Sequence, residues 1–305
     1  MPWVGPRQPY SRLRGLEWLV RVPIVTLSRL PGSLGDEVAQ GLAERLCFRL
    51  VTRPELIRLA DEQLGGPGAW ERSPELGERA PSFWERVTGE RQHYRYCAVL
   101  RSVVFQRAEQ DDVVIAGLGA GRVLRGLPQV LAVLVTAPPE VRLERIVERG
   151  FEGVAGPLPR DRARDLLRRR EHDSATYMRY MFGINWLEAH HWDLVLDTSR
   201  FAVPQSVEVL SAIVERGLLQ ATPADRQRLA DLGLASNVEQ TLLGRPGVLP
   251  DRLKVVADSG RVRLEGEVGD EADRAAAEQA ARAVPGVREL QSELLVHAPP
   301  TPIGG

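Results

Sequence analysis

Short, continuous apolar runs alternate with amphipathic stretches along the first two thirds of the chain. Such runs are typical of strands buried on both faces, and we expect strands at Val22–Leu27, Asp112–Ala116, Val130–Thr136 and Trp192–Leu196. Between the first two runs, apolar residues recur at helical spacing from Asp36 to Cys47. This alternation predicts an α/β fold, in which a parallel sheet is covered by helices on both faces.

Further helices are predicted from the same spacing. They are a helix that begins near Pro138 or Pro139, a long charged helix over Arg160–Phe182, and a last one over Pro204–Glu215. Residues 53–110 are polar and rich in arginine, and we interpret them as a mobile, mostly helical insertion. Residues 150–159 are interpreted as a flexible segment.

The composition changes after Gly217, where a second, smaller unit is predicted. Residues 221–228 have the composition of a linker that leads into a helix ending at about Leu243. The elements expected after it are a hairpin of Leu253–Ala257 and Arg261–Val268, an alanine-rich helix over Asp270–Ala283 and a strand over Val287–Val296. The order helix, hairpin, helix, strand (αββαβ) describes a small α/β domain.

Length and charge narrow the class of protein. The 305 residues are 43% hydrophobic, enough for one large domain or two unequal ones. A net charge of −1 argues against broad nucleic-acid binding. The apolar stretches are too short to cross a bilayer, and residues 1–18 lack the apolar core of an export signal. With only two cysteines, Cys47 and Cys97, a reduced, cytoplasmic protein is expected.

Basic residues are almost all arginine. Lys254 is the only lysine, and the other 39 basic residues are arginine. Chemistry that needs a lysine earlier in the chain is therefore excluded. Arginine binds phosphate well through its planar fork, but it is a poor proton carrier.

A glycine turn, Gly32-Ser33-Leu34-Gly35, follows the first predicted strand and precedes the first predicted helix. In that position, backbone N–H groups and the positive end of the helix dipole favour a phosphate, and Arg29 supplies charge. The motif alone is often only a tight turn. Asp36 and Glu37 stand where a P-loop has its lysine and hydroxyl residue, so the turn indicates nucleotide or phosphate binding more than efficient phosphoryl transfer.

Two other groups of polar residues favour ordinary structural roles. Arg142, Arg145 and Arg149 share one face of a predicted helix, but acidic neighbours favour a solvated face. His190 and His191 are adjacent, so they do not share a face, and we expect no metal site here because no third ligand is near in sequence.

Several segments together resemble the cytidylate-kinase-like family of P-loop nucleoside-monophosphate kinases. They are IVTLSRLPGSLGDEVAQGLAERLCFRLVTRPELI (24–57), VVIAGLGAGRVLRGLPQVLAVLVTAPPEVRLERIVER (113–149) and YMRYMFGINWLEAHHWDLVLDTSRF (177–201). The resemblance covers about residues 20–217. It implies a parallel-sheet nucleotide-kinase-like domain with a monophosphate-binding insertion and a lid near 150–175. The implied reaction transfers the ATP γ-phosphate to a pyrimidine monophosphate, with magnesium.

The resemblance also implies roles for single residues. Those expected to bind the nucleotide are Arg29, Gly32, Ser33 and Gly35; those expected to be catalytic are Arg29, Arg122 and Asp173. Arg122 is included because the family's Gly-Arg-Gly segment has Leu118 in place of its arginine, and Arg122 follows four residues later.

Other family positions differ too. The family's first turn is usually Gly-Ser-Gly-Gly, often followed by arginine, where this chain has Leu34 and Asp36. In the family's lid pattern Asp-Arg-Tyr, Tyr177 matches and either Asp173 or Glu171 matches, but residues 174–176 supply no arginine. Each of these changes removes a charged or a flexible residue from the site. Phosphoryl transfer depends on electrostatics and positioning, so such residues matter to it.

Residues 229–297 resemble a BON domain, a family associated with membrane-surface or small-ligand binding. The matching segments are DSGRVRLEGEV (258–268) and VPGVRELQSELLV (284–296). The acidic helix between them argues against direct attraction to anionic lipid. The resemblance leaves a small ligand, a membrane surface or a protein as the partner, and a plain packing or dimerisation domain as the alternative.

The expected organisation is an N-terminal tail (1–19), a kinase-like domain (20–217), a linker (218–228), a BON-like domain (229–297) and a C-terminal tail (298–305). Three functions are compatible with it: an active nucleotide kinase, a nucleotide-binding pseudokinase that signals to the BON-like domain, and a scaffold led by that domain. Nucleotide is the expected ligand in the first two, with ATP and magnesium implied by the family resemblance alone.

Overall fold

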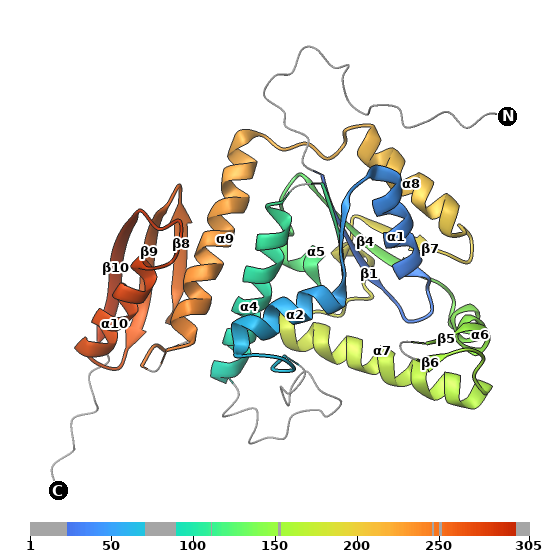
Figure 1. Cartoon of the computed structure of the whole chain (residues 1–305), viewed down its shortest axis with the longest axis horizontal. Helices are drawn as coiled ribbons and strands as arrows, with labels where there is room; N and C mark the ends of the chain where they lie inside the picture. The colour runs from blue at the N-terminus through green and yellow to red at the C-terminus, as the bar shows by residue number, and fades with distance from the viewer. Residues whose placement is uncertain are drawn as a thin grey trace, which may run out of the picture.

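The computed structural model describes residues 23–70, 90–110, 112–151, 154–245, 247–249 and 252–296. The tails expected at 1–19 and 298–305 lie outside these residues, as does part of the expected insertion. Figure 1 shows a larger unit, in which helices surround a sheet, and a smaller unit with its own sheet. A long helix, α9 (Pro223–Leu243), lies between the two units.

The larger unit is built on a five-stranded parallel sheet. Its strands, in the order β2-β3-β1-β4-β7, are Arg49–Val51, Val113–Ala116, Ile24–Arg29, Val130–Thr136 and Leu194–Asp197. The predicted parallel α/β sheet is thus confirmed. Strand β2 was not predicted, because three residues give no readable period. Because β1 is central, the carboxyl ends of β3 and β4 lie on either side of its own carboxyl end.

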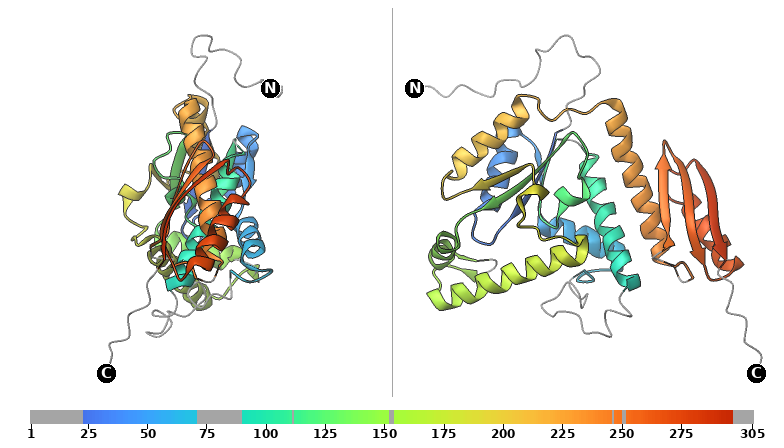
Figure 2. Two further views of the ribbon diagram at one scale, coloured as in Figure 1. Left: turned by 90° about the vertical axis from the view of Figure 1, so that its left-hand side faces the viewer. Right: turned by 180° about the vertical axis from the view of Figure 1, so that it is seen from behind.

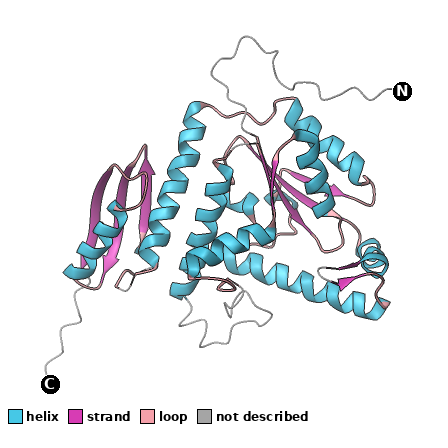
Figure 3. Cartoon of the chain, viewed as in Figure 1, coloured by secondary structure: helices cyan, strands magenta, loops and turns pink. Residues whose placement is uncertain are grey.

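Alternate residues of the strands point to opposite faces of the sheet, and each face carries its own core. Val114 and Ala116 pack under α1 (Gly35–Leu46) and α8 (Val203–Glu215). Val113 and Ile115 pack under the helices of the other face, which are α2 (Arg53–Leu64), α4 (Glu90–Ala108) and the single turn α5 (Ala120–Val123). These two layers are visible in Figures 2 and 3.

Two further helices lie at the carboxyl end of the sheet. Helices α6 (Pro139–Arg149) and α7 (Arg160–Phe182) are joined by a small hairpin, β5 (Gly150–Phe151) and β6 (Val154–Ala155), where the sequence predicts a flexible segment. Helix α7 runs along the edge of the larger unit in Figure 1. None of the described helices has both the length and the apolar character that crossing a bilayer requires.

The smaller unit has the predicted order of helix, hairpin, helix and strand. After α9 come β8 (Lys254–Asp258), β9 (Arg261–Val268), α10 (Glu271–Arg282) and β10 (Glu289–Val296), with β9 central in the sheet. Residues of α9, α10 and the sheet share one core; among them are Val238, Leu242 and Leu264.

Helix α9 begins earlier than the sequence indicated. Residues 223–228, interpreted as linker, form its first turns, because Thr222 and Asp225 make a capping box: Thr222 Oγ1 accepts from Asp225 N at 3.2 Å, and Asp225 Oδ2 accepts from Thr222 N at 2.9 Å. Leu229 of α9 is buried in the core of the larger unit. The helix therefore belongs to both cores.

Polar contacts also hold α9 against α4. Ser102 Oγ donates to Asn237 Oδ1 at 2.7 Å, and Arg101 pairs with Glu239 at 2.6 Å. Ser102 is 2% exposed, so its hydroxyl has no access to solvent as an alternative partner. This contact fixes the register of the two helices.

Replacing Asn237 by alanine is expected to lower the free energy of unfolding by about 1–2 kcal/mol, because the buried hydroxyl of Ser102 loses its acceptor. Denaturant unfolding of the full chain measures the loss. Glu239→Gln is the matched control on the same helix, since a partly exposed ion pair contributes less than about 1 kcal/mol. Equal losses in the two variants would contradict this account of the interface.

Candidate functional site

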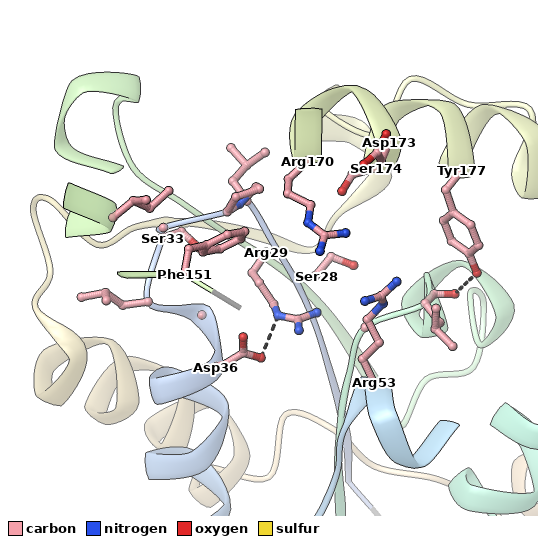
Figure 4. Close-up of a pocket in the computed structure, with 18 of the residues that line it drawn as sticks. Ser28, Arg29, Ser33, Asp36, Arg53, Phe151, Arg170, Asp173, Ser174 and Tyr177 are labelled. Atoms are coloured by element: carbon pink, nitrogen blue, oxygen red, sulfur yellow. Dashed lines mark hydrogen bonds and ion pairs between the residues drawn. The ribbon is translucent and has the colours of Figure 1, made fainter. Parts of the chain in front are cut away.

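A cleft of about 920 Å³ opens at the carboxyl end of the sheet. The turn between β1 and α1 forms its floor, and the other walls come from the first residue of α2, the loop after β3, the hairpin after α6 and the middle of α7. Figure 4 shows this arrangement. Ligands of parallel α/β proteins usually bind at this end of the sheet, where connections from neighbouring strands diverge.

The turn presents the first amides of α1 to the cleft. Its N-cap, Leu34, has φ +61° and makes no side-chain capping hydrogen bond, and Leu34, Gly35, Asp36 and Glu37 all line the cleft. The first N–H groups of a helix have no partner within the helix, so a ligand anion can accept from them. The positive φ of Leu34 is a backbone conformation that glycine adopts without steric cost.

Side chains behind the turn hold its carbonyl groups. Arg142 donates to Pro31 O at 3.2 Å, Arg145 to Gly32 O at 3.3 Å, and Thr198 Oγ1 to Ser33 O at 2.7 Å. In a trans peptide the following N–H points the opposite way, so these contacts turn the amide of Leu34 away from Thr198. Gly32 permits the close approach, since a Cβ there would lie 2.8 Å from Arg142 O.

The two arginines behind the turn are structural. Arg142 is buried, donates to Ala137 O at 2.8 Å and pairs with Glu171 of α7 at 2.7 Å. Arg145 also donates to Thr198 O at 2.9 Å. Burial lowers the pKa of Arg145, and the neighbouring charge of Arg149 lowers it further. The sequence expectation of a solvated face fails for these two residues because their partners come from distant elements.

Arg29 lies at the centre of the cleft. Its Nε pairs with Asp36 Oδ1 at 2.8 Å, as Figure 4 shows. Its aliphatic part packs on Gly35, where a Cβ would lie 2.4 Å from Arg29 Cβ, and a Cβ on Gly117 would lie 3.1 Å from Arg29 NH1. Two glycines thus make room for Arg29, and its guanidinium reaches the loop after β3. The carboxylate of Asp36 occupies one side of that guanidinium.

Three guanidinium groups from three elements point toward one another in the cleft: Arg29 of β1, Arg53 of α2 and Arg170 of α7 (Figure 4). Sequence reasoning missed Arg53. It is the first residue of α2, two residues after the end of the short strand β2, and its side chain packs beside Gly117. Among the described residues, no carboxylate forms an ion pair with Arg53.

The cleft carries an excess of positive charge. Among the described residues, five arginines and three acids line it; the arginines are Arg29, Arg53, Arg145, Arg149 and Arg170, and the acids are Asp36, Glu37 and Asp173. Converging like charges repel one another, which raises the electrostatic energy of the empty cleft. An anion placed between them lowers that energy. The predicted residues Arg29, Gly32, Ser33, Gly35 and Asp173 all line this cleft.

Arg122, which was expected to be catalytic, is not among the residues that line the cleft. Gly119 starts the single turn α5, and a Cβ on Gly121 would lie 2.7 Å from Thr26 Oγ1 of β1, so α5 lies against the sheet. Arg122 is thereby brought toward His191. Burial lowers the pKa of His191, and the charges of His190 and Arg122 lower it further. Burial lowers the pKa of Arg122 as well. Its Nε and NH1 are buried without a hydrogen-bond partner among the described residues.

The loop after β3 is fixed by α7. Leu118, with φ +50°, lines the cleft, and its carbonyl accepts from Tyr177 Oη at 3.1 Å. Burial raises the pKa of Tyr177, so its phenol stays protonated and keeps this donor. Tyr177, the position that matches the lid pattern, therefore ties α7 to the loop.

Replacing Gly119 by alanine is expected to destabilise the protein by more than about 1–2 kcal/mol. In a residue with a side chain, a φ of +71° costs about 1–2 kcal/mol by itself. The new Cβ would in addition lie 2.4 Å from Phe182 Cε2. Gly156→Ala is the control, since Gly156 has φ +89° with open space around it. Thermal unfolding should show the larger loss for Gly119→Ala; equal losses would contradict the packing of Phe182 on Gly119.

Comparison with known proteins adds two family matches. Residues 24–200 match the model of the cytidylate kinase-like family, which is more than half of the chain. Residues 230–298 match the model of the BON domain. The first match spans the sheet, the turn, the loop after β3 and α7, and so contains every element that forms the cleft.

Two curated relatives are similar over the same part of the chain. Cytidylate kinase of Methanopyrus kandleri is 27% identical over 208 residues, covering 66% of this chain and 97% of the relative. Cytidylate kinase of Methanosarcina acetivorans is 23% identical over 199 residues, covering 63% and 96%. A crystal structure of an uncharacterized protein from Eubacterium ventriosum superposes with a TM-score of 0.46 at 17% identity, covering 63% of this chain and 98% of that one.

Proposed function

Because the chain belongs to the cytidylate kinase-like family, we propose that the cleft binds nucleotides through their phosphates. The activity proposed with it is transfer of the ATP γ-phosphate to a pyrimidine nucleoside monophosphate. The two relatives named cytidylate kinase favour this substrate class.

The convergence of Arg29, Arg53 and Arg170 in a cleft that the uncapped start of α1 also lines is the observation that carries the proposal. Backbone amides and guanidinium groups both donate hydrogen bonds to phosphate oxygens, and charge-assisted bonds of this kind are the strong ones. Arg53 and Arg170 come from opposite sides of the cleft. They can therefore position the phosphate of an acceptor between them.

The cleft also has donor atoms of the type that magnesium prefers, the carboxylates of Asp36, Glu37 and Asp173. When bound, magnesium neutralises phosphate charge. The chain's own residues hold the phosphates, through the amides of the turn and the arginines. Arg142, Arg145 and Thr198 keep the turn in place, and Tyr177 keeps the loop after β3 against α7.

A second candidate is a nucleotide-binding pseudokinase that signals to the BON domain. The ion pair between Asp36 and Arg29 favours it, because a carboxylate beside the turn repels the phosphates of a donor nucleotide. Helix α9, which shares a core with both units, provides a physical connection to the BON domain. The partner proposed for that domain is a small ligand, a membrane surface or a protein.

A nucleotide panel tests both candidates. Calorimetric titration of the full chain with CMP, UMP, dCMP and ATP, each with and without magnesium, is expected to show saturable binding of a pyrimidine monophosphate. A coupled assay with Mg-ATP then separates the two: turnover above background supports the kinase, and binding without turnover supports the pseudokinase. The absence of binding by every nucleotide, with inorganic phosphate as control, overturns the proposal.

A further inference from the structure

Three side chains that can ligate a metal converge outside the cleft, at the turn before β7. This turn is the short 3-10 helix η1 (Ala189–His191). Glu188, His190 and His191 each offer one ligand atom, and these atoms all lie within 4.8 Å of one another. Glu188 Oε2 is 3.6 Å from His190 Nε2 and 3.8 Å from His191 Nε2.

The sequence pattern did not indicate Glu188 as a third ligand, although it lies only two residues before the histidine pair. A 3-10 turn brings residues i and i+3 to the same side, so Glu188 meets His191, and His190 reaches the same carboxylate oxygen. None of the three residues lines the cleft. The cluster is therefore separate from the proposed nucleotide site.

The carboxylate is held in place from behind. Asn185 Nδ2 donates to Glu188 Oε1 at 3.2 Å, which leaves Oε2 toward the two histidines. The backbone of the turn is closed by His191 N to Glu188 O at 3.1 Å and Glu188 N to Asn185 O at 3.2 Å. Metal ligands in proteins are usually oriented by a second hydrogen bond of this kind.

The cluster has one buried side and one open side. The side chain of His191 is 9% exposed, whereas His190 is 66% exposed and Glu188 49%. An ion can therefore enter from solvent and keep water at its remaining positions. Two imidazole nitrogens and one carboxylate oxygen are a common zinc ligand set.

The ligand atoms select the kind of ion. Two of the three are imidazole nitrogens and one is a carboxylate oxygen. Zinc, nickel and copper bind imidazole strongly, whereas magnesium and calcium prefer oxygen ligands. We propose that Glu188, His190 and His191 form a binding site for a divalent late transition-metal ion such as zinc.

The test is zinc binding by the full, untagged chain after treatment with a chelator. Calorimetry with zinc chloride is compared for the wild type, His190→Ala, Glu188→Gln and the control His172→Ala, which removes an exposed histidine of α7. With only five histidines in the chain, their ring signals in an NMR spectrum identify the ligands directly. Thermal unfolding of each variant shows whether it is folded.

The proposal predicts that zinc shifts the signals of His190 and His191 and not that of His172. It also predicts that His190→Ala and Glu188→Gln each weaken zinc binding by at least about tenfold, whereas His172→Ala leaves it unchanged. Magnesium at the same concentration should not shift these signals. Zinc binding that is equal in all four proteins, or no binding by the wild type, overturns the proposal.

Discussion

Replacing Arg53 by alanine is expected to weaken binding of a pyrimidine monophosphate about 10- to 100-fold while leaving stability unchanged. Arg53 is exposed, begins α2 and points into the cleft, and no carboxylate pairs with it among the described residues. A hydrogen bond to a charged group contributes about 1.5–3 kcal/mol, which corresponds to that range of affinity. Calorimetric titration of the full chain with CMP measures the change.

Arg58→Ala is the matched control for this experiment. Arg58 lies on the same helix, carries the same charge and pairs with Glu62 on the surface, away from the cleft. This variant tests whether the overall electrostatic field of the protein, rather than direct contact with the nucleotide, accounts for the weaker binding. Equal weakening by the two variants would show that Arg53 does not touch the ligand.

Replacing Asp36 by asparagine is expected to tighten the binding of ATP, measured without magnesium, about tenfold. The substitution keeps the shape of the side chain, removes a negative charge beside the phosphates and releases Arg29 from its ion pair. A unit charge a few ångströms away is worth about 1 kcal/mol or more in a partly aqueous site, which is the size of the predicted gain. The gain should shrink as salt is added, because salt screens exposed charges.

The same substitution should lower the stability of the protein, although it tightens ATP binding. Asp36 lies in the first turn of α1, where a carboxylate interacts favourably with the helix dipole, so Asp36→Asn should cost about 0.3–1 kcal/mol of unfolding free energy. Asp161→Asn, at the start of α7 and outside the cleft, is the control for charge alone. If ATP binds Asp36→Asn no more tightly than the wild type, Asp36 is not what limits donor binding.

The elements with a clear period were predictable from the sequence. The run Val130–Thr136 and the helix Arg160–Phe182 have the predicted bounds, because long continuous or amphipathic patterns leave little ambiguity. The start of α9 was missed although Thr222, Pro223 and Asp225 are a local signal of a helix start. Only the burial of Leu229 depends on the packing of that helix against the larger unit. Local composition around residue 223 carries no sign of that contact.

Most of the residues expected at the site come from one segment, and Asp173 of α7 was expected only from the family resemblance. The turn Gly32–Gly35 and the nearby Arg29 stand beside each other in the sequence, and the structure places them together in the cleft. Arg53 was missed because its place depends on β2, a strand of three residues. Arg122 was expected there because it follows Leu118, which replaces the family's arginine, by four residues. The one-turn helix that carries Arg122 toward His191 has no sequence pattern of its own.

The central claim is that the amides at the start of α1 receive a phosphate. The most direct test is an NMR titration of the ¹⁵N-labelled full chain with ATP, which follows the backbone amides of Leu34, Gly35 and Asp36. The account predicts saturable shifts of these three signals, with Gly156 and Gly233, which lie outside the cleft, unchanged. Saturable binding that leaves these three amides unshifted would contradict it.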